Sequence, residues 1–167
     1  MTTGVSAEPT IIGLISDTHG LLRPEVLDAL AGVSLIVHAG DVGRGGILDR
    51  LGELAPVVAV RGNNDVTGAE ADLPVTQLVE AAGIRLLVTH ELTDALATDA
   101  HASARVVVTG HSHRPRIDER DGRLFVNPGS AGPRRFRLPV TIARLSVVGS
   151  SVEAQIVSLI PTQDRRI

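Results

Sequence analysis

The chain contains no cysteine and no lysine, so all sixteen of its Lys+Arg residues are arginine. Without cysteine it can have no disulfide framework, zinc finger or thiol nucleophile. Without lysine, Schiff-base chemistry and a P-loop lysine are excluded. The absence of cysteine also suits a reducing compartment, and we expect a cytoplasmic protein.

Aromatic residues are scarce, at 1% of the chain, and are limited to Phe125 and Phe136. Aliphatic side chains must therefore fill the core, and platforms for stacking nucleic-acid bases are missing. The net charge of −3 gives no overall attraction for nucleic acid or anionic lipid. Residues 1–9 lack the features of a signal peptide, and no apolar run reaches transmembrane length. We therefore expect neither nucleic acid nor a membrane among the partners.

What is present is typical of a globular protein, with 43% hydrophobic and 21% charged residues in a chain of 167. That length fits one domain with an ordinary core. We predict a single domain over residues 10–160, with flexible ends at residues 1–9 and 161–167.

The first half of that domain alternates between strand and helix patterns. Apolar runs occupy residues 11–15, 35–38 and 57–60. A helix beginning at Pro24 is expected between the first two runs, and a helix beginning near Ile47 between the next two. This order favours parallel neighbouring strands joined by right-handed crossovers.

The second half changes to hairpin patterns. Hairpins are predicted for residues 74–80 with 84–89, 115–118 with 123–127, and 139–147 with 152–159. A short helix, with Leu92, Ala95 and Leu96 on one face, is expected before a strand at residues 105–109. Together the two halves predict an α/β (α+β) fold, in which two mixed sheets pack face to face and helices cover the outside.

Side chains with metal-binding atoms follow the apolar runs of both halves. The set consists of Asp17, His19, Asp41, Asn63, His90, His111 and His113, with Asn64 as an additional candidate. If the runs lie side by side, their carboxyl ends form the edge at which open α/β sheets bind ligands. Oxygen and imidazole ligands without thiolate indicate a hydrolytic centre, and their number suits two divalent metal ions.

Each member of this set has a simpler alternative role. Asp17 and Asp41 could cap turns, Asn63 could belong to a turn, and His90 could be a buried structural histidine. Two imidazoles two residues apart, as in the turn that begins at His111, are unusual as core filler. Because all of these residues share one context, the end of an apolar strand, their joint occurrence favours the metal centre.

The same residues carry a resemblance to a known family. The ordered motifs are Asp17-Thr18-His19-Gly20, Gly40-Asp41-Val42, Gly62-Asn63-Asn64-Asp65, Thr89-His90 and Gly110-His111-Ser112-His113. Over roughly residues 11–160 they resemble the calcineurin-like metallophosphoesterases, above all the small single-domain phosphodiesterases of bacteria and archaea. The turn Asn127-Pro128-Gly129-Ser130 also matches one that recurs near the site in these small members.

The resemblance implies a four-layer αββα sandwich and a site for two divalent metal ions. By position, the first ion would be held by Asp17, His19 and His113, the second by Asn63, His90 and His111, and both by a bridging Asp41. Manganese is the favoured metal, and iron, nickel, zinc and magnesium stay open as alternatives.

The implied activity is phosphodiester hydrolysis of a small phosphoester by a hydroxide that bridges the two metals. His90 and the metals would offset charge on the phosphoryl oxygens. Where many family members carry a histidine that protonates the leaving group, this chain has Asn64, an amide that donates a hydrogen bond but no proton. We therefore expect esters with acidic leaving groups, such as aryl esters, to react far better than alkyl esters.

Glu91 stands where small members of the family commonly have glycine. We interpret it as a solvated loop residue rather than an acceptor for an imidazole N–H.

Two alternative functions stay open. One is a phosphoesterase-like scaffold or binding subunit with little catalysis, comparable to the small family relative in the endosomal retromer coat. A scaffold is free to lose metal ligands, whereas here every expected ligand is present. The other is a phosphomonoesterase or nucleotide hydrolase that uses the same centre.

Several polar residues near these motifs are given structural roles instead. His38 is read as a buried scaffold residue, and Asp65 as the cap of the turn after Asn64. The cluster of Arg134, Arg135 and Arg137 is read as a solvated face or as a contact between copies in a homo-oligomer, with a phosphate clamp as the alternative.

Overall fold

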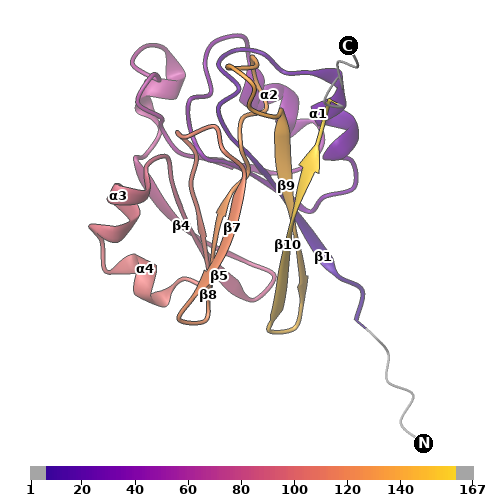
Figure 1. The fold of residues 1–167 in the computed structure, drawn as a ribbon, viewed down its shortest axis with the longest axis vertical. Coiled ribbons are helices and arrows are strands. Elements are labelled where there is room, and N and C mark those ends of the chain that lie inside the picture. Colours follow the sequence, from indigo (N-terminus) through magenta and orange to yellow (C-terminus); the bar gives the residue numbers. More distant parts are fainter. Residues whose placement is uncertain (1–6, 161–167) are drawn as a thin grey trace, which may run out of the picture.

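The computed structural model describes residues 7–160 and contains two five-stranded sheets packed face to face (Figure 1). The strand order is β10-β9-β1-β2-β3 in the first sheet and β4-β5-β6-β8-β7 in the second. Short helices lie on the outer faces of both sheets. The predicted sandwich of two mixed sheets is therefore confirmed.

The first sheet is built on three parallel strands from the first half of the chain. These are β1 (Thr10–Ile15), β2 (Leu35–His38) and β3 (Val57–Ala59), connected through α1 (Pro24–Ala29) and α2 (Ile47–Gly52). The antiparallel hairpin of β9 (Thr141–Val148) and β10 (Ser151–Ser158) completes this sheet by pairing β9 with β1. Because β1 is covered on both faces, its sequence is a continuous apolar run rather than an alternating one.

The second sheet combines two hairpins with a central parallel strand. Its strands are β4 (Thr76–Ala81), β5 (Ile84–Thr89), β6 (Val106–Val108), β7 (Arg116–Arg120) and β8 (Arg123–Asn127). Strand β6 runs parallel to both β5 and β8. The single-turn elements η1 (Ala69–Asp72), α3 (Leu92–Leu96) and α4 (Ala100–Ser103) lie in the connections. All three predicted hairpins are present.

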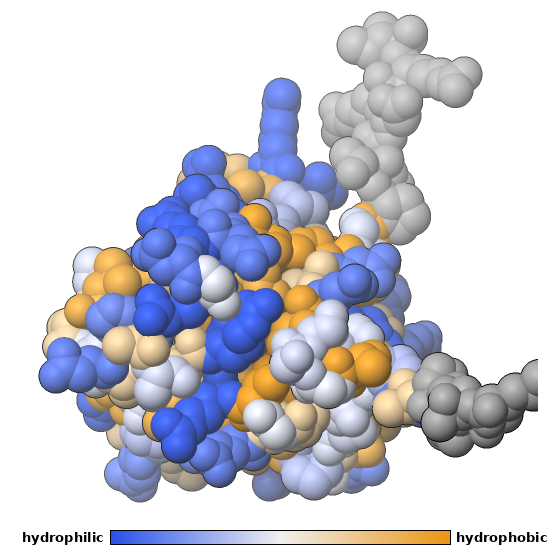
Figure 2. Space-filling model, turned by 90° about the horizontal axis from the view of Figure 1, so that it is seen from below, coloured by the Kyte–Doolittle hydropathy of each residue, from blue (hydrophilic) through white to orange (hydrophobic). Residues whose placement is uncertain are grey.

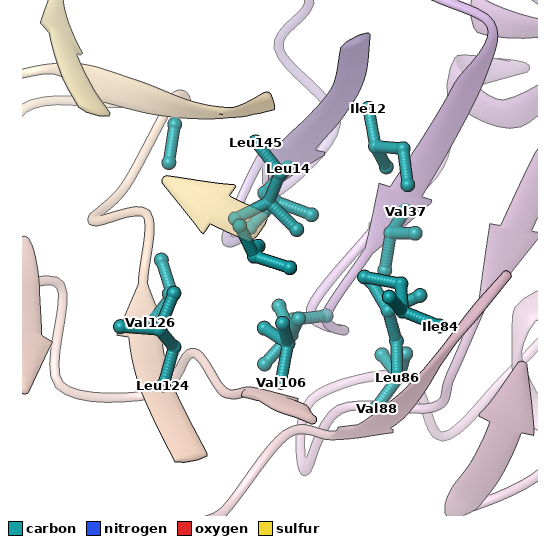
Figure 3. Close-up of a cluster of buried hydrophobic side chains, with 14 of the residues drawn as sticks. Ile12, Leu14, Val37, Ile84, Leu86, Val88, Val106, Leu124, Val126 and Leu145 are labelled. Carbon is teal, nitrogen blue, oxygen red and sulfur yellow. The ribbon is translucent and has the colours of Figure 1, made fainter. Parts of the chain in front are cut away.

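The core is aliphatic and divides into three clusters that define four layers. The largest cluster fills the space between the two sheets, with residues such as Leu14, Leu86 and Val126 contributed by both (Figure 3). A second cluster packs α1 and α2 against the first sheet, and a smaller one packs α3 and α4 against the second. Neither aromatic residue is fully buried, since Phe125 is half-buried and Phe136 is 94% exposed.

The short helix predicted before the strand at residues 105–109 is present as α3. Helix α3 buries only Ala95, while Leu92 is 42% and Leu96 is 53% exposed. A helix of five residues has little more than one turn, so it can press only one side chain against the sheet. Two leucines are thereby left beside Phe125 on the surface.

The flexible ends predicted at residues 161–167, and most of residues 1–9, fall outside the part of the chain that the structure describes. Among residues 7–160, no helix is long and apolar enough to cross a membrane. Seen from below, the surface mixes hydrophilic side chains with a hydrophobic strip (Figure 2).

Candidate metal centre

The seven predicted metal ligands lie together at one end of the sandwich, on loops at the carboxyl ends of strands β1, β2, β3, β5 and β6. The first three strands belong to one sheet and the other two belong to the second sheet. Because parallel strands end at the same edge, polar residues placed after each strand converge without any help from helices.

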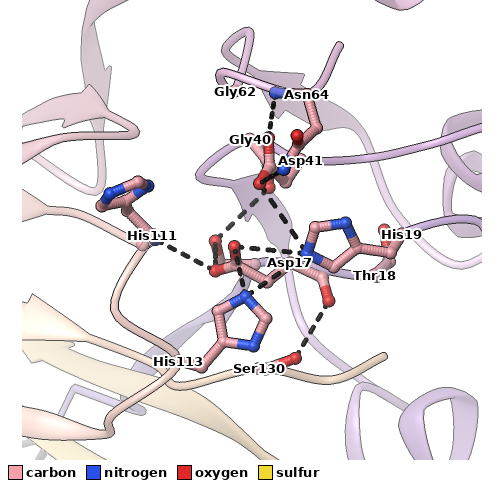
Figure 4. A network of polar contacts seen from close by, with 12 residues as sticks. Asp17, Thr18, His19, Gly40, Asp41, Gly62, Asn64, His111, His113 and Ser130 are labelled. Atoms are coloured by element: carbon pink, nitrogen blue, oxygen red, sulfur yellow. Dashed lines mark hydrogen bonds and ion pairs between the residues drawn. The ribbon is translucent and has the colours of Figure 1, made fainter. Parts of the chain in front are cut away.

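A first group of donor atoms comprises Asp17, His19 and His113. The His113 Nε2 atom lies 3.2 Å from Asp17 Oδ1 and 3.3 Å from His19 Nε2, and His19 Nε2 lies 3.8 Å from Asp17 Oδ1 (Figure 4). One carboxylate oxygen and two imidazole nitrogens at these separations can all reach a single divalent cation.

A second group comprises Asp17, Asp41 and His90. The His90 Nε2 atom lies 3.4 Å from Asp41 Oδ2 and 3.9 Å from Asp17 Oδ1. Asp41 Oδ2 also lies 3.7 Å from His19 Nε2. The Asp41 carboxylate therefore faces donors of both groups.

Asn63 and His111 form the solvent-exposed side of the site. Their side chains meet at 3.1 Å between Asn63 Oδ1 and His111 Nδ1. The His111 ring stands edge-on to the His90 ring, with 5.2 Å between ring centroids. These two residues thus adjoin the second group through His90.

Three side-chain atoms of the candidate ligands are buried without a hydrogen-bond partner: Asp17 Oδ1, His90 Nε2 and His113 Nδ1. The first two of these atoms face the other donors. Leaving such an atom unsatisfied costs about 1–3 kcal/mol, and more where the atom carries charge. A divalent cation would satisfy both atoms, so the residues present fit a metal.

The backbone of the site is strained. Five of the seven candidate ligands have a positive φ, from 46° to 70°: Asp17, His19, Asp41, His111 and His113. Non-glycine residues rarely adopt this left-handed conformation, which tends to persist at functional sites where the surrounding structure enforces it. Here it turns each ligand out of its strand toward a common point.

Two glycines let the ligand loops approach each other closely. A Cβ atom on Gly62 would lie 2.1 Å from Asp41 Oδ1, and one on Gly110 would lie 2.0 Å from Ser16 Oγ. No side chain fits at either distance, so the sequence motifs Gly62-Asn63 and Gly110-His111 have a steric basis.

Hydrogen bonds fix the Asp17 side chain so that one oxygen stays free. Ser16 Oγ donates to Asp17 Oδ2 at 2.6 Å, and the His111 N–H donates to the same atom at 3.2 Å.

Ser130 Oγ donates to the Asp17 carbonyl at 3.0 Å. Asn127 Nδ2 donates to the Gly110 carbonyl at 2.8 Å. The predicted turn at residues 127–130 therefore lies beside the site and supports it.

Asn64 and Asp65 organise the loop that carries Asp41. The Asn64 N–H donates to Asp41 Oδ1, and Asn64 Nδ2 donates to Asp41 Oδ2, both at 2.8 Å. The Asp65 carboxylate accepts the N–H groups of Val42, Gly43 and Gly62 at 2.9–3.1 Å. Asp65 thus has the capping role predicted for it, and the Asn64 side chain is bound to Asp41.

The ionisation of the site follows from burial and from these partners. Burial lowers the pKa of His90, but the Asp41 carboxylate 3.4 Å from its Nε2 atom and the nearby Asp17 charge outweigh that effect, so this pKa is raised overall. Burial tends to raise the pKa of Asp41, yet the close approach of His90 and the hydrogen bonds from Asn64 hold it well below its usual range. The His90 Nδ1 atom lies 2.7 Å from the Ala39 carbonyl, which leaves Nε2 facing the carboxylates.

His38 stands behind the site as a neutral histidine. Its Nδ1 accepts the Gly40 N–H at 3.2 Å, and its Nε2 lies 3.0 Å from Thr18 Oγ1, which itself donates to the Val42 carbonyl. Full burial lowers the pKa of His38 to about 4. The scaffold role predicted for this residue agrees with these contacts.

Comparison with known proteins gives the family. A model described as the calcineurin-like phosphoesterase superfamily domain matches residues 11–150. A protein of Methanocaldococcus jannaschii named as a probable metallophosphoesterase is 35% identical over 163 residues, covering 89% of this chain and 81% of that protein. The chain belongs to the calcineurin-like phosphoesterase superfamily. The family resemblance of its motifs is therefore confirmed.

Solved structures share the fold of this metallophosphoesterase. The phosphoesterase Yfce of E. coli is 26% identical, with a TM-score of 0.63, and the match covers 90% of this chain and 100% of that one. Vacuolar Protein Sorting 29 of Cryptosporidium parvum is 18% identical, with a TM-score of 0.73, and the match covers 91% and 100% of the two chains. The second likeness concerns the fold alone.

Three residues near the site of this phosphoesterase were either not predicted to contribute or can now be compared with their predicted roles: Ser16, Arg135 and Glu91. Ser16 was not singled out, because its contact with Asp17 depends on a strand-end geometry that sequence spacing does not give. Arg135 is exposed, yet its positive charge adds to burial in lowering the pKa of His19, against the opposing effect of Asp41 and Asp17. Within residues 7–160 no hydrogen bond joins the Glu91 carboxylate to an imidazole.

Proposed function

We propose that this metallophosphoesterase is a phosphodiesterase that works with two divalent metal ions and acts on a small phosphoester. The observation that carries the proposal is the position of Asp41, whose Oδ2 atom lies 3.7 Å from His19 Nε2 and 3.4 Å from His90 Nε2. A carboxylate that faces two donor groups is placed to bridge two cations. Bound divalent cations supply a hydroxide nucleophile at neutral pH and offset the charge of the phosphoryl oxygens.

In this proposal His19, His113 and Asp17 would hold one cation, and Asn63, His90 and His111 would hold the other. Ser16 and the His111 N–H occupy the Asp17 Oδ2 atom, which leaves Oδ1 available to a metal. His90 is oriented by the Ala39 carbonyl, so its Nε2 atom is presented to the centre. Manganese is our choice of metal for assays.

The protein groups also shape the choice of substrate. The Asn64 amide donates to Asp41 rather than to solvent, and an amide cannot deliver a proton. An ester whose leaving group departs as a stable anion needs no such proton. Aryl diesters should therefore react far faster than alkyl diesters, and equal rates on the two would contradict this part of the proposal.

The test is turnover of a bis-aryl phosphate by metal-stripped protein, with and without added Mn²⁺. Wild type should be active only with the metal, and Asp41→Asn should lose at least about 100-fold in kcat, because a neutral amide cannot bridge two cations. The asparagine side chain keeps the shape of aspartate and tolerates positive φ, so the variant should fold. A wild-type protein that carried two metals and stayed inert would favour a scaffold function instead.

A further inference from the structure

A hollow of about 340 Å³ lies on the β7–β8 hairpin directly beside the metal centre. Side chains on a strand alternate between faces, so Arg116, Asp118 and Arg120 of β7 point to the same side. In the register of the hairpin, Arg116 stands opposite Asn127 and Asp118 stands opposite Phe125. This shared face forms the floor of the hollow, which we call the hairpin hollow.

The inner end of the hairpin hollow is the loop that carries the predicted ligand His111. Gly110, His111 and Ser112 all line the hollow. Asn127 ties this loop to the hairpin, because its Nδ2 atom donates to the Gly110 carbonyl at 2.8 Å and to Ser112 Oγ at 3.1 Å. A molecule that reaches the metal centre past His111 can therefore extend into the hollow.

The hairpin hollow is rich in positive charge, although the chain as a whole has a net charge of −3. The single carboxylate of Asp118 pairs with Arg116 Nε at 2.7 Å and with Arg120 Nη2 at 3.3 Å. Arg114 also lines the hollow, and no hydrogen bond or ion pair holds its guanidinium within residues 7–160. One carboxylate cannot balance three guanidinium groups, so the hollow favours an anion.

The hollow also has an apolar wall. Leu92 reaches it from α3 and is 42% exposed. The half-buried Phe125 ring lies on the floor, with the Arg120 guanidinium 5.7 Å from the ring centroid. A ligand for this surface combines a flat or apolar body with negative charge.

We propose that the hairpin hollow binds one ester substituent of the substrate and selects an aromatic group that carries a second anionic charge. This inference rests on the proposed phosphodiesterase function. The apolar body of the substituent packs against Leu92 and Phe125, while its anionic group accepts hydrogen bonds from Arg114 and Arg116. The volume suits one ring with its charged group rather than a polymer.

The kinetic test compares two diesters that share a 4-nitrophenyl leaving group. The second substituent is a phenyl ring that carries either a carboxylate or the matching neutral carboxamide. With Mn²⁺ and wild-type protein, the carboxylate ester should have about a tenfold higher kcat/KM, mainly through a lower KM, since charge-assisted hydrogen bonds are stronger than neutral ones. Equal kcat/KM values for the two esters would overturn the inference while leaving the proposed function intact.

Variants that are expected to change the kcat/KM ratio of the two esters in opposite directions sharpen this comparison. Arg114→Ala and Arg116→Ala should bring the ratio between the two esters close to one, whereas Asp118→Asn removes the competing carboxylate and should raise the ratio. Arg85→Ala is the matched control, because Arg85 is an exposed arginine of the same sheet that pairs with Glu80 at 2.9 Å and does not line the hollow. A ratio that moved equally in Arg85→Ala and Arg116→Ala would contradict a local site.

A binding test separates this inference from catalysis. Terephthalate, an aromatic ring with two carboxylates and no phosphorus, is titrated into metal-free protein and followed by amide chemical shifts. Shifts should concentrate at residues of β7, β8 and the His111 loop, and the apparent Kd should rise at least fivefold in Arg116→Ala. If neither ester were hydrolysed, the proposed function would fail, and this titration alone would decide whether the hollow binds anionic aromatic groups. Shifts absent from the hollow would overturn the inference.

Discussion

At the scale of single residues, the Asp41 carboxylate is held in place by Asn64, which lies outside the set of seven predicted ligands. The backbone and side chain of Asn64 each donate to one of its oxygens at 2.8 Å. Such partners orient a ligand, so that little side-chain freedom is lost when a cation binds. We therefore expect Asn64 to contribute to metal affinity in addition to any effect on the leaving group.

Replacement of Asn64 by alanine should weaken metal binding. The variant loses the bond from Nδ2 to Asp41 Oδ2 but keeps the backbone donor, and removal of such a partner lowers metal affinity about 10–100-fold. Equilibrium dialysis with Mn²⁺ measures the change. Gln155→Ala, which removes an exposed amide from β10, is the control and should bind like wild type. An unchanged affinity in Asn64→Ala would show that the observed hydrogen bonds do not prepare the site.

Sequence spacing identifies candidate ligands but not the residues that hold them. Asp17, Asp41 and His90 could be singled out because each follows an apolar strand, and strand ends converge at one edge of the sheet. The roles of Ser16 and Ser130 could not be predicted, because both depend on side-chain directions fixed only by the packed fold. The same holds for Asn64, whose position in a turn gives no hint that it binds Asp41.

At the scale of structural elements, the loops after the strands combine function with strain. A left-handed conformation costs a non-glycine residue roughly 1–2 kcal/mol. The ligand loops contain five such residues, and their strain is opposed by hydrogen bonds such as the one from the His111 N–H to Asp17. The metal-free protein should therefore gain stability when a ligand in this conformation is replaced by glycine.

His111→Gly tests this idea because the His111 side chain is exposed and its φ is 70°. We expect the metal-free variant to be more stable than wild type by up to about 1 kcal/mol, or roughly 2–4 °C in Tm. Urea unfolding in the presence of EDTA measures this difference. With Mn²⁺ present, the order should reverse, because the variant has lost a ligand.

Ser112→Gly is the control for that experiment. Ser112 is the exposed neighbour of His111 and does not have a positive φ, and its Oγ accepts hydrogen bonds from Asn127 Nδ2 and the Arg114 N–H, so glycine there should lower stability on both counts. If both glycine variants were destabilised equally without metal, backbone strain at His111 would make no significant contribution to the free energy of unfolding.

The elements themselves were predictable to different degrees. The alternating first half and the three hairpins follow from apolar runs and turn residues, and each appears in the structure. Which side chains of α3 are buried could not be predicted. The spacing of its apolar residues indicates an amphipathic helix but does not show how many of those residues the sheet can cover. The exposed Leu92 that results is part of the hairpin hollow.

At the scale of the whole molecule, loops from both sheets meet at the metal centre, and His38 lies behind them. It is fully buried among β2 and the first ligand loop, and burial lowers its pKa to about 4. A histidine in the unfolded chain has a pKa of about 6.5. The unfolded state therefore binds a proton more readily between these values, and acid favours unfolding.

His38 should make the stability of the metal-free protein depend on pH. Its contribution is fully present above about pH 6.5 and is lost as the pH falls toward 4, a change of about 3 kcal/mol. His38→Asn cannot titrate, so its stability difference from wild type should shrink over that range, as measured by urea unfolding in EDTA. Parallel stability profiles for the two proteins between pH 7 and pH 4 would rule out this role.

The number of cations per chain tests the central claim most directly. Metal-stripped wild type should bind two Mn²⁺ ions per chain in equilibrium dialysis, with magnetic coupling between them in the electron paramagnetic resonance spectrum. Asp41→Asn should weaken the coupling, because its carboxylate faces both donor groups. A saturated wild-type protein that held only one ion, or two ions without coupling, would contradict the account.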